Sequence, residues 1–247
     1  MRIDTSNMVA SLLKNTASQP DSQRAIANYR QLASGYDATC RRIDALRTRA
    51  MRELALKCGD VVFDVGCGTG SSLPMLAAAV GPAGHVVGVE LSPEMAELAR
   101  QRIAREICDS RVEVVQAPVE EFEPEVEADA LFLSYTHDVL QSPTAVDRLL
   151  TIAKPGARIV LLGMKTLPWL WGWPVNAFNL IRAHCYLTTH TNLDMPWRPL
   201  AERGVILRQT HSALWGSAYI AAGRFPAAPH GSPSEHSPLG PHSRAST

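Results

Sequence analysis

The feature that most constrains this chain is the stretch VVFDVGCGTG at residues 61–70. β-branched and aromatic residues run directly into three glycines on alternate positions, Gly66, Gly68 and Gly70. Valine and phenylalanine favour strands, and glycines let a backbone approach a ligand closely because they have no Cβ atom. The stretch therefore predicts a buried strand followed by a ligand-binding loop.

A dinucleotide-binding loop is the first alternative for this segment. Its fingerprint is G-x-G-x-x-G, with the third glycine three positions after the second. Counted from Gly66 that position is Ser71, and counted from Gly68 it is Leu73, so the fingerprint fails in both registers. The pattern present is D-x-G-x-G-x-G, which begins at Asp64.

Strand and helix patterns alternate through the rest of the chain. We expect parallel strands at 61–65, 85–90, 111–116, 129–135 and 157–163, with helices over 71–81, 93–107 and 143–153 between them. Two closing strands follow at 204–210 and 214–223, as a hairpin joined through HSA at 211–213. This alternation is typical of an α/β fold with right-handed crossovers and a doubly wound sheet.

The chain of 247 residues is 46% hydrophobic, enough for one domain with a sizeable core. We expect an N-terminal helical cap at 1–57 and a main domain at 58–224, with an aromatic insertion at about 164–200. Residues 225–247 are rich in Pro, Ser, Gly and His, a composition typical of a flexible tail.

The formal net charge is zero, which gives no reason to expect a nucleic-acid partner. Residues 1–52 do hold nine Lys or Arg against four Asp or Glu, so a basic arm that binds an anionic substrate or membrane surface is an open alternative.

Five cysteines without a CxxC pair argue against a disulfide framework or a zinc site, and no metal is expected. The N-terminus lacks the apolar core of a signal peptide, and prolines and a glycine interrupt the apolar stretch at 167–181, so a cytoplasmic location is expected.

Three stretches together resemble the class I S-adenosylmethionine (SAM)-dependent methyltransferases. They are FDVGCGTG, then VVGVELSPEM about twenty residues later, then AKPGARIVLLG, and the resemblance covers roughly residues 25–163. It implies a Rossmann-like, seven-stranded, mostly parallel sheet with helices on both faces and an antiparallel last strand. It also implies SAM as the cofactor.

The resemblance places the cofactor at the glycine loop and at the ends of the neighbouring strands. Free loop amides and the following helix N-terminus would favour a carboxylate, and Glu90 would accept hydrogen bonds from the ribose hydroxyls. Ala117-Pro118 stand where the family often carries an acid for adenine, so adenine would rely on backbone groups, Gln116 or Glu120. We interpret Cys67 as a space-filler. The expected cofactor set is Asp64, Gly66, Cys67, Gly68, Gly70, Glu90, Leu91, Ala117, Pro118, Val119 and Ser134.

Polar residues after the fourth strand mark the expected acceptor side. His137 is the candidate general base because its reference pKa suits proton removal near neutrality, and Asp138 is the candidate to orient it. The alternatives are that both residues cap the next helix, or that alignment alone drives the reaction. Candidate acceptor contacts are Tyr29, Tyr36, Tyr135, His137, Trp169, Trp171 and Trp173, with core packing as the alternative for the aromatic residues; His184, His190 and Trp197 are weaker candidates.

Three functions remain open from the sequence. The first is a SAM-dependent methyltransferase that moves a methyl group to an O or N atom of a small molecule. The second is a lipid or quinone methyltransferase at a membrane surface, and the third is a SAM-binding protein without catalysis. No NPPY-type tetrapeptide follows the fourth strand, which argues against methylation of nucleic-acid bases. The sequence does not predict the oligomeric state.

Overall fold

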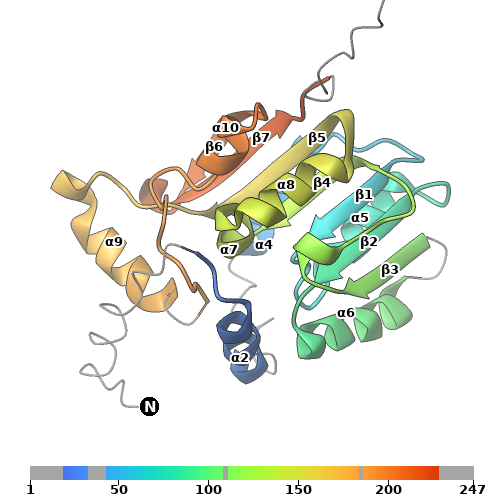
Figure 1. The fold of residues 1–247 in the computed structure, drawn as a ribbon, viewed down its shortest axis with the longest axis horizontal. Helices are drawn as coiled ribbons and strands as arrows, with labels where there is room; N and C mark the ends of the chain where they lie inside the picture. Colours follow the sequence, from blue (N-terminus) through green and yellow to red (C-terminus); the bar gives the residue numbers. More distant parts are fainter. Residues whose placement is uncertain (1–18, 33–42, 108–110, 184–185, 228–247) are drawn as a thin grey trace, which may run out of the picture.

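The computed structural model describes residues 19–32, 43–107, 111–183 and 186–227. Seven strands form one sheet in the order β3-β2-β1-β4-β5-β7-β6 (Figure 1). Their bounds are Val61–Val65 for β1, His85–Glu90 for β2, Arg111–Gln116 for β3, Ala128–Ser134 for β4, Ala153–Met164 for β5, Ile206–Ala213 for β6 and Ala218–Arg224 for β7.

Strands β1 to β5 are parallel, whereas β7 runs antiparallel to both of its neighbours, β5 and β6. This confirms the expected Rossmann-like sheet with an antiparallel last strand. The position of the hairpin turn was predicted wrongly. His211–Ala213 belong to β6, and the turn is the short helix η4 at Leu214–Gly216. The chain can reverse there because Gly216 has a φ of 95°.

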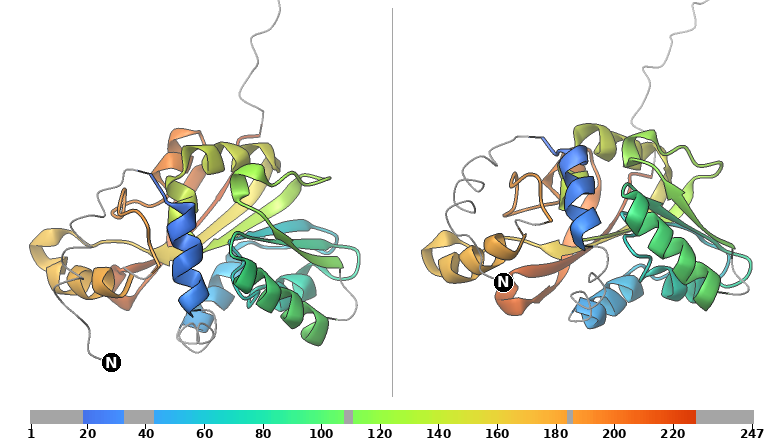
Figure 2. Two further views of the ribbon diagram at one scale, coloured as in Figure 1. Left: turned by 60° about the horizontal axis from the view of Figure 1, so that its bottom comes forward. Right: turned by 90° about the horizontal axis from the view of Figure 1, so that it is seen from below.

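Helices lie on both faces of the sheet (Figures 1 and 2). The central strands are buried on both faces, so adjacent residues of one strand belong to different cores: Phe63 and Leu131 to one, Val62 and Phe132 to the other. Helices α7, α8 and α10 supply the first core, and α4, α5 and α6 supply the second. The helix bounds are α2 Ser22–Leu32, α4 Asp44–Glu53, α5 Leu73–Val80, α6 Pro93–Glu106, α7 His137–Gln141, α8 Pro143–Thr151, α9 Trp169–Ala183 and α10 Arg198–Glu202, with a 3₁₀ turn η3 at Val119–Glu121.

Capping residues explain where two of the helices begin. Ser92 and Ser142 precede α6 and α8, and each is followed by a proline at the first helical position. Their hydroxyl groups accept hydrogen bonds from the backbone N–H of Met95 and Ala145, at 3.4 and 3.2 Å. Each cap thereby satisfies one of the N–H groups that a helix start leaves unpaired.

Two parts of the chain differ from the sequence-based expectation. The three tryptophans lie within α9 itself and not in a loop before a helix. Phe225 is buried and its N–H donates to the carbonyl oxygen of Ala157, so the packed domain extends past residue 224.

Tyr36, His184 and residues 228–247 lie outside the described residues. Among the helices that the structure describes, none has both the length and the apolar composition required to cross a membrane.

Candidate active site

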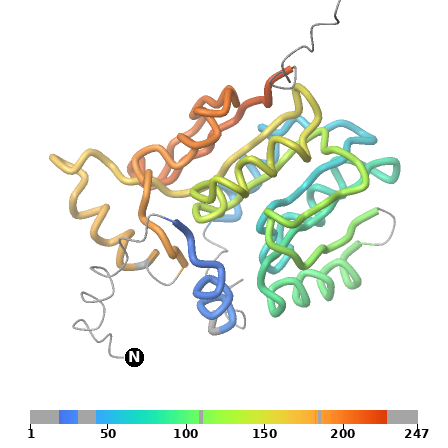
Figure 3. The backbone as a smooth tube through the Cα atoms, in the orientation of Figure 1, coloured from blue at the N-terminus to red at the C-terminus, as the bar shows by residue number. Residues whose placement is uncertain are grey.

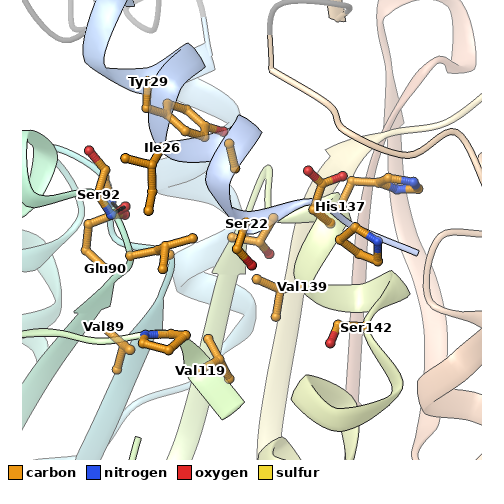
Figure 4. Close-up of a pocket in the computed structure, with 18 of the residues that line it drawn as sticks. Ser22, Ile26, Tyr29, Val89, Glu90, Ser92, Val119, His137, Val139 and Ser142 are labelled. Carbon is orange, nitrogen blue, oxygen red and sulfur yellow. Dashed lines mark hydrogen bonds between the residues drawn. The ribbon is translucent and has the colours of Figure 1, made fainter. Parts of the chain in front are cut away.

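A pocket lies at the carboxyl-terminal ends of β1, β2 and β4, and residues of α2 line it as well. Figures 2 and 3 show α2 beside these strand ends. Figure 4 shows Glu90 and Ser92 on one side of this pocket, His137 on the other, and Ile26 and Tyr29 of α2 above. Eight of the eleven expected cofactor residues line it: Gly66, Gly68, Glu90, Leu91, Ala117, Pro118, Val119 and Ser134. Tyr29, Tyr135, His137 and Asp138 line it as well.

The glycine loop bends sharply between β1 and α5. Gly66, Gly68 and Gly70 all have left-handed backbones, with φ of 71°, 58° and 73°. A Cβ atom on Gly66 would lie 2.4 Å from Cγ2 of Thr136, so glycine is required there by both conformation and space.

The amides of this loop are not free, which corrects an expectation from the sequence. Gly66 and Cys67 donate to the carbonyl oxygen of Val89, and Gly70 donates to that of Cys67. Gly68 donates to Oε2 of Glu90 at 2.8 Å. The loop is therefore stabilised by its own hydrogen bonds, and binding a carboxylate is not the task of these four N–H groups.

Glu90 is buried at the end of β2 and faces the pocket. Its Oε1 accepts a hydrogen bond from Ser92 N, and its Oε2 accepts the bond from Gly68 N; both are 2.8 Å long. Burial raises the pKa of Glu90, and the hydrogen bonds from Ser92, Gly68 and Leu91 oppose that rise. A carboxylate has about four lone pairs, so beside these three donors the group can still accept a hydrogen bond from a ligand.

Three of the expected cofactor residues are not among those that line the pocket. Gly70 packs against Ala99 and Leu73, and the Cys67 thiol is buried in the core beside Gly88. Burial raises the pKa of Cys67, consistent with an inert thiol. The carboxyl group of Asp64 is buried, and its Oδ2 has no hydrogen-bond partner among the described residues. Burial raises the pKa of Asp64 to about 7, Arg47 lowers it and Glu90 raises it further.

Helix α2 forms the roof of the pocket and is tied down at both ends. Near its end, Nε of Arg30 lies 2.5 Å from Oε1 of Glu94 on α6. Before its start, Asp21 N donates to Oγ1 of Thr188 at 3.0 Å, and that hydroxyl donates to Oδ2 of Asp138 at 2.7 Å. Asp138 thus connects the roof to the first turn of α7.

These contacts correct the expected pairing of Asp138 with His137. The Asp138 carboxylate accepts hydrogen bonds from the backbone N–H groups of Thr188 and Thr189, besides the Thr188 hydroxyl. His137 is buried, and neither of its ring nitrogens has a hydrogen-bond partner among the residues that the structure describes. Burial lowers the pKa of His137 to about 4, His190 adds to that effect, and the Thr191 backbone opposes it. At neutral pH the ring is uncharged, the form that a general base requires.

A second cavity, of about 800 Å³, lies between β5, α9 and the segment 190–194. Its apolar lining is Leu167, Pro168, Trp169, Leu180 and Leu193, and His190 lines it too. Nε2 of His190 is buried without a partner among the described residues. His190 lies close enough to His137 to lower its pKa, although it does not line the first pocket.

The aromatic candidates thus separate into groups. Tyr29 and Tyr135 line the first pocket, and Trp169 lines the second cavity. Trp171 and Trp173 are exposed on α9 and line neither. Trp197 packs in the core against Tyr219, with ring centroids 4.8 Å apart.

Residues 62–156 match the family model described as a methyltransferase domain. This span holds the glycine loop, Glu90 and His137, the residues around which the pocket is built. The chain contains a class I SAM-dependent methyltransferase domain.

Curated relatives resemble the methyltransferase domain at moderate identity. A demethylmenaquinone methyltransferase of Clavibacter sepedonicus is 33% identical over 149 residues, which cover 58% of each chain. A 2-phytyl-1,4-naphthoquinone methyltransferase of Synechococcus elongatus is 33% identical over 122 residues, 47% of this chain and 50% of that one. The chain thus spans about half the length of these relatives.

Solved structures support the fold of the methyltransferase domain. The geranyl diphosphate C-methyltransferase of Streptomyces coelicolor, solved with Mg²⁺, geranyl diphosphate and S-adenosyl-L-homocysteine, aligns with a TM-score of 0.56. It is 18% identical, and the alignment covers 73% of this chain and 78% of that one. At this identity the likeness concerns the fold alone.

The pocket of the methyltransferase domain suits a nucleoside cofactor such as SAM. The buried carboxylate of Glu90 faces the pocket and can accept a hydrogen bond from a ligand. Gly66 and Gly68 line the pocket without side chains, and apolar residues surround them. Glu120, a candidate for adenine, instead accepts a hydrogen bond from the Ser142 hydroxyl at 2.7 Å. Pro118 offers no N–H group, so no acid or amide of the expected kind stands at that position.

Sequence reasoning missed the roof and one wall of the pocket. The roof residues include Asp21, Ser22 and Ile26, and the wall includes Tyr186 and Leu187. The helical pattern near residue 29 indicated a cover but not which side chains face inward. Tyr186 and Leu187 carry no motif. The hydrogen bonds of Asp138 to the neighbouring Thr188 and Thr189, and a ring contact of Tyr186 with Tyr29 at 6.4 Å, hold them at the pocket.

Proposed function

We propose that this protein transfers the methyl group of SAM to an apolar small molecule of the quinone or isoprenoid type. The proposal rests chiefly on His137, a buried, uncharged imidazole without a partner among the described residues, which lines the pocket opposite Glu90. An unpaired buried polar group costs free energy, so the ring favours a ligand that can form a hydrogen bond with it.

SAM, when bound, supplies a methyl group on a positively charged sulfur, which makes the methyl carbon electrophilic. Glu90 would hold the ribose hydroxyls through the free lone pairs of its carboxylate. Gly66 and Gly68 would allow the cofactor to lie close to the backbone. Ala117, Pro118 and Val119 would form the surface beneath the adenine.

His137 would act on the acceptor. As the acceptor gains a methyl group it loses a proton, and a neutral imidazole nitrogen can take that proton. The lowered pKa of about 4 makes His137 a weaker base than a free imidazole, so alignment of the acceptor carries much of the rate. Asp138 would act as a positioning residue, because it holds the Thr188–Thr189 segment and, through Thr188, the start of α2.

The second cavity favours an acceptor with an apolar extension. Half of the residues that line it are apolar, and Trp169 is among them. The names of the relatives also favour this class, since they refer to demethylmenaquinone and 2-phytyl-1,4-naphthoquinone.

The acceptor atom is the point on which two proposals differ. The polar residues after β4 suit an O or N acceptor, as expected from the sequence. A curated relative of Syntrophotalea carbinolica, 33% identical over 118 residues, is named a ubiquinone/menaquinone biosynthesis C-methyltransferase, which favours carbon. Both reactions release one proton from the acceptor, so His137 has the same task in each.

The test uses SAM labelled with ¹³C in its methyl group and a panel of reduced naphthoquinones with and without a prenyl chain. NMR of the product separates methyl groups on oxygen, nitrogen and carbon by their chemical shifts. We expect a labelled product that forms faster with the prenylated acceptors. A Trp169→Ala variant should lose that preference, whereas Trp171→Ala, which lies outside both cavities, should keep it.

A SAM-binding protein without catalysis is the competing function. Calorimetry with SAM and with S-adenosyl-L-homocysteine distinguishes it from the proposal. Binding of both compounds without transfer to any quinone, isoprenoid, phenol or amine acceptor would support that function. Failure of both compounds to bind would contradict the two functions together.

A further inference from the structure

The exposed apolar side chains are concentrated at one end of the molecule. Eight of the eleven large hydrophobic side chains that are exposed among the described residues lie on α9 and on the η4 turn. They are Trp169, Leu170, Trp171, Trp173, Phe178, Ile181, Leu214 and Trp215. We call this set the α9–η4 surface. It lies at the opposite end of the molecule from α6 and β3 (Figure 1).

Two contacts bring the η4 turn next to α9. Lys165, in the connector before α9, donates its N–H to the Ser217 carbonyl oxygen at 2.8 Å. A Cβ atom on Gly216 would lie 3.1 Å from Cδ2 of Leu167 in the same connector. The exposed side chains of Leu214 and Trp215 therefore belong to the same end of the molecule as the start of α9.

The outer face of α9 is apolar without interruption. At 100° per residue, Trp169, Trp173, Leu170, Ile181, Phe178 and Trp171 cover an arc of about 200°. Pro174, Ala177 and the partly buried Leu180 share that arc with them, so no polar residue lies within it. Surface helices of globular proteins ordinarily place polar residues on the face away from the core, so this helix has the opposite arrangement.

Contacts on the inner face hold α9 in this orientation. The side-chain amide of Asn176 donates to the Leu167 carbonyl oxygen and accepts from Leu167 N, both at 2.8 Å. Asn176 is buried, and a Cβ atom on Gly172 would lie 2.3 Å from Cβ of Leu167. Leu167 thus packs directly on the Gly172 backbone, and rotation of α9 to bury its tryptophans would break both hydrogen bonds and this contact.

The segment that carries α9 is basic. Residues 164–193 contain Lys165 and Arg182. This segment contains no aspartate or glutamate. Tryptophan, leucine and phenylalanine beside basic residues without acids is the composition of helices that lie at anionic lipid surfaces.

We propose that the α9–η4 surface docks on the surface of an anionic lipid bilayer. The 15 residues of α9 extend about 22 Å at 1.5 Å per residue, less than the roughly 30 Å of a hydrocarbon core, so the helix lies in the plane of the interface. The tryptophans insert at headgroup depth, where their rings are favoured. Trp169 also lines the second cavity, so the docked face lies beside the cavity that we assign to the acceptor.

The test is co-sedimentation of the full chain with vesicles of phosphatidylcholine, with and without phosphatidylglycerol. The docking variant is Leu170→Ser with Trp215→Ser, because both side chains are almost fully exposed, at 94% and 86%, and neither lines a cavity. The matched control is Val126→Ser with Ile206→Ser, two exposed apolar residues outside the surface. SAM binding by calorimetry serves as the measure of folding for each protein.

We expect the wild type to bind the anionic vesicles more tightly than the neutral ones, and less tightly as salt is added. The docking variant should lose at least about tenfold in partitioning, since each side chain removes a large apolar contact. The control pair should partition like the wild type. Equal partitioning of the docking variant and the wild type would overturn the proposal. So would a wild type that ignores both vesicles but forms a dimer that the docking variant cannot form.

Discussion

Replacing Glu90 by glutamine tests how the domain holds its cofactor. In the wild type, Oε1 accepts from Ser92 N and Oε2 accepts from Gly68 N, each at 2.8 Å. Glutamine keeps the shape of the side chain but offers only one oxygen. One of the two backbone N–H groups therefore loses its acceptor, and the cofactor loses a charged one.

The two losses have separate magnitudes. A buried N–H group without a partner costs about 1–3 kcal/mol of stability, which corresponds to a fall in the melting temperature of about 2–4 °C per kcal/mol for a chain of this size. A lost hydrogen bond to a charged group is worth about 1.5–3 kcal/mol in binding. SAM should therefore bind the variant roughly ten to a hundred times more weakly, at 1.4 kcal/mol per factor of ten.

Calorimetric titration with SAM and a thermal melt measure the two losses independently. Glu113→Gln on the neighbouring strand β3 is the matched control, because that side chain is exposed and its ion-pair partner is His85, at 3.2 Å. The control should bind SAM like the wild type. A Glu90→Gln variant that melts lower yet binds SAM with unchanged affinity would refute the reasoning. Glu90 would then only stabilise the loop.

Three further predictions concern residues around the pocket. His137→Gln should leave SAM affinity nearly unchanged but slow methyl transfer to an acceptor of high pKa. In the wild type we expect kcat/KM to fall as the pH falls toward about 4, and the variant should lack this fall; an unchanged rate and pH profile would exclude His137 as the base. Gly66→Ala should lower the free energy of unfolding by roughly 2–4 kcal/mol, because the new Cβ both strains the left-handed backbone and collides with Thr136. Gly156 also has a left-handed backbone, with a φ of 75°, but open space around it, so Gly156→Ala should cost only the backbone strain of roughly 1–2 kcal/mol. Equal losses in denaturant melts would contradict this. The pKa of Asp64 is raised in the folded state, so the folded protein holds a proton on Asp64 at pH values where the unfolded chain has lost it. The contribution of Asp64 to stability therefore falls as the pH rises from 3.8 to about 7, by roughly 4 kcal/mol at 1.36 kcal/mol per pKa unit. Asp64→Asn should remove this dependence, and superimposable curves of unfolding free energy against pH for variant and wild type would refute it.

The sheet could be predicted from the sequence because its signals are local. Short apolar runs bounded by Gly and Pro mark the strands, and Ser92-Pro93 marks a helix start whatever surrounds it. The hairpin turn was misplaced because HSA has ordinary turn composition, whereas Leu214 and Trp215 are residue types that rarely adopt the left-handed backbones they have here, with φ of 49° and 57°. No composition rule selects such residues for a turn.

The cofactor side of the site could be predicted better than the acceptor side. Gly66, Gly68 and Glu90 sit at fixed spacings from strand ends, so chain order alone brings them together. The partner of Asp138 is Thr188, fifty residues away, and the wall around Leu187 depends on that contact. Alternation of Trp169, Trp171 and Trp173 suggested that all three contact the acceptor, but in a helix Trp171 points away from Trp169 and Trp173, and of the three only Trp169 lines a cavity.

The measurement that tests the account most directly is a crystal structure of the protein grown with S-adenosyl-L-homocysteine, the product that the reaction leaves behind. We predict that its sugar hydroxyls donate to the Glu90 carboxylate, that its base lies over Ala117 and Pro118, and that its sulfur faces His137 beneath α2. A complex in which the compound occupies another part of the molecule, with the crevice between Gly66 and Glu90 holding only water, would contradict the account.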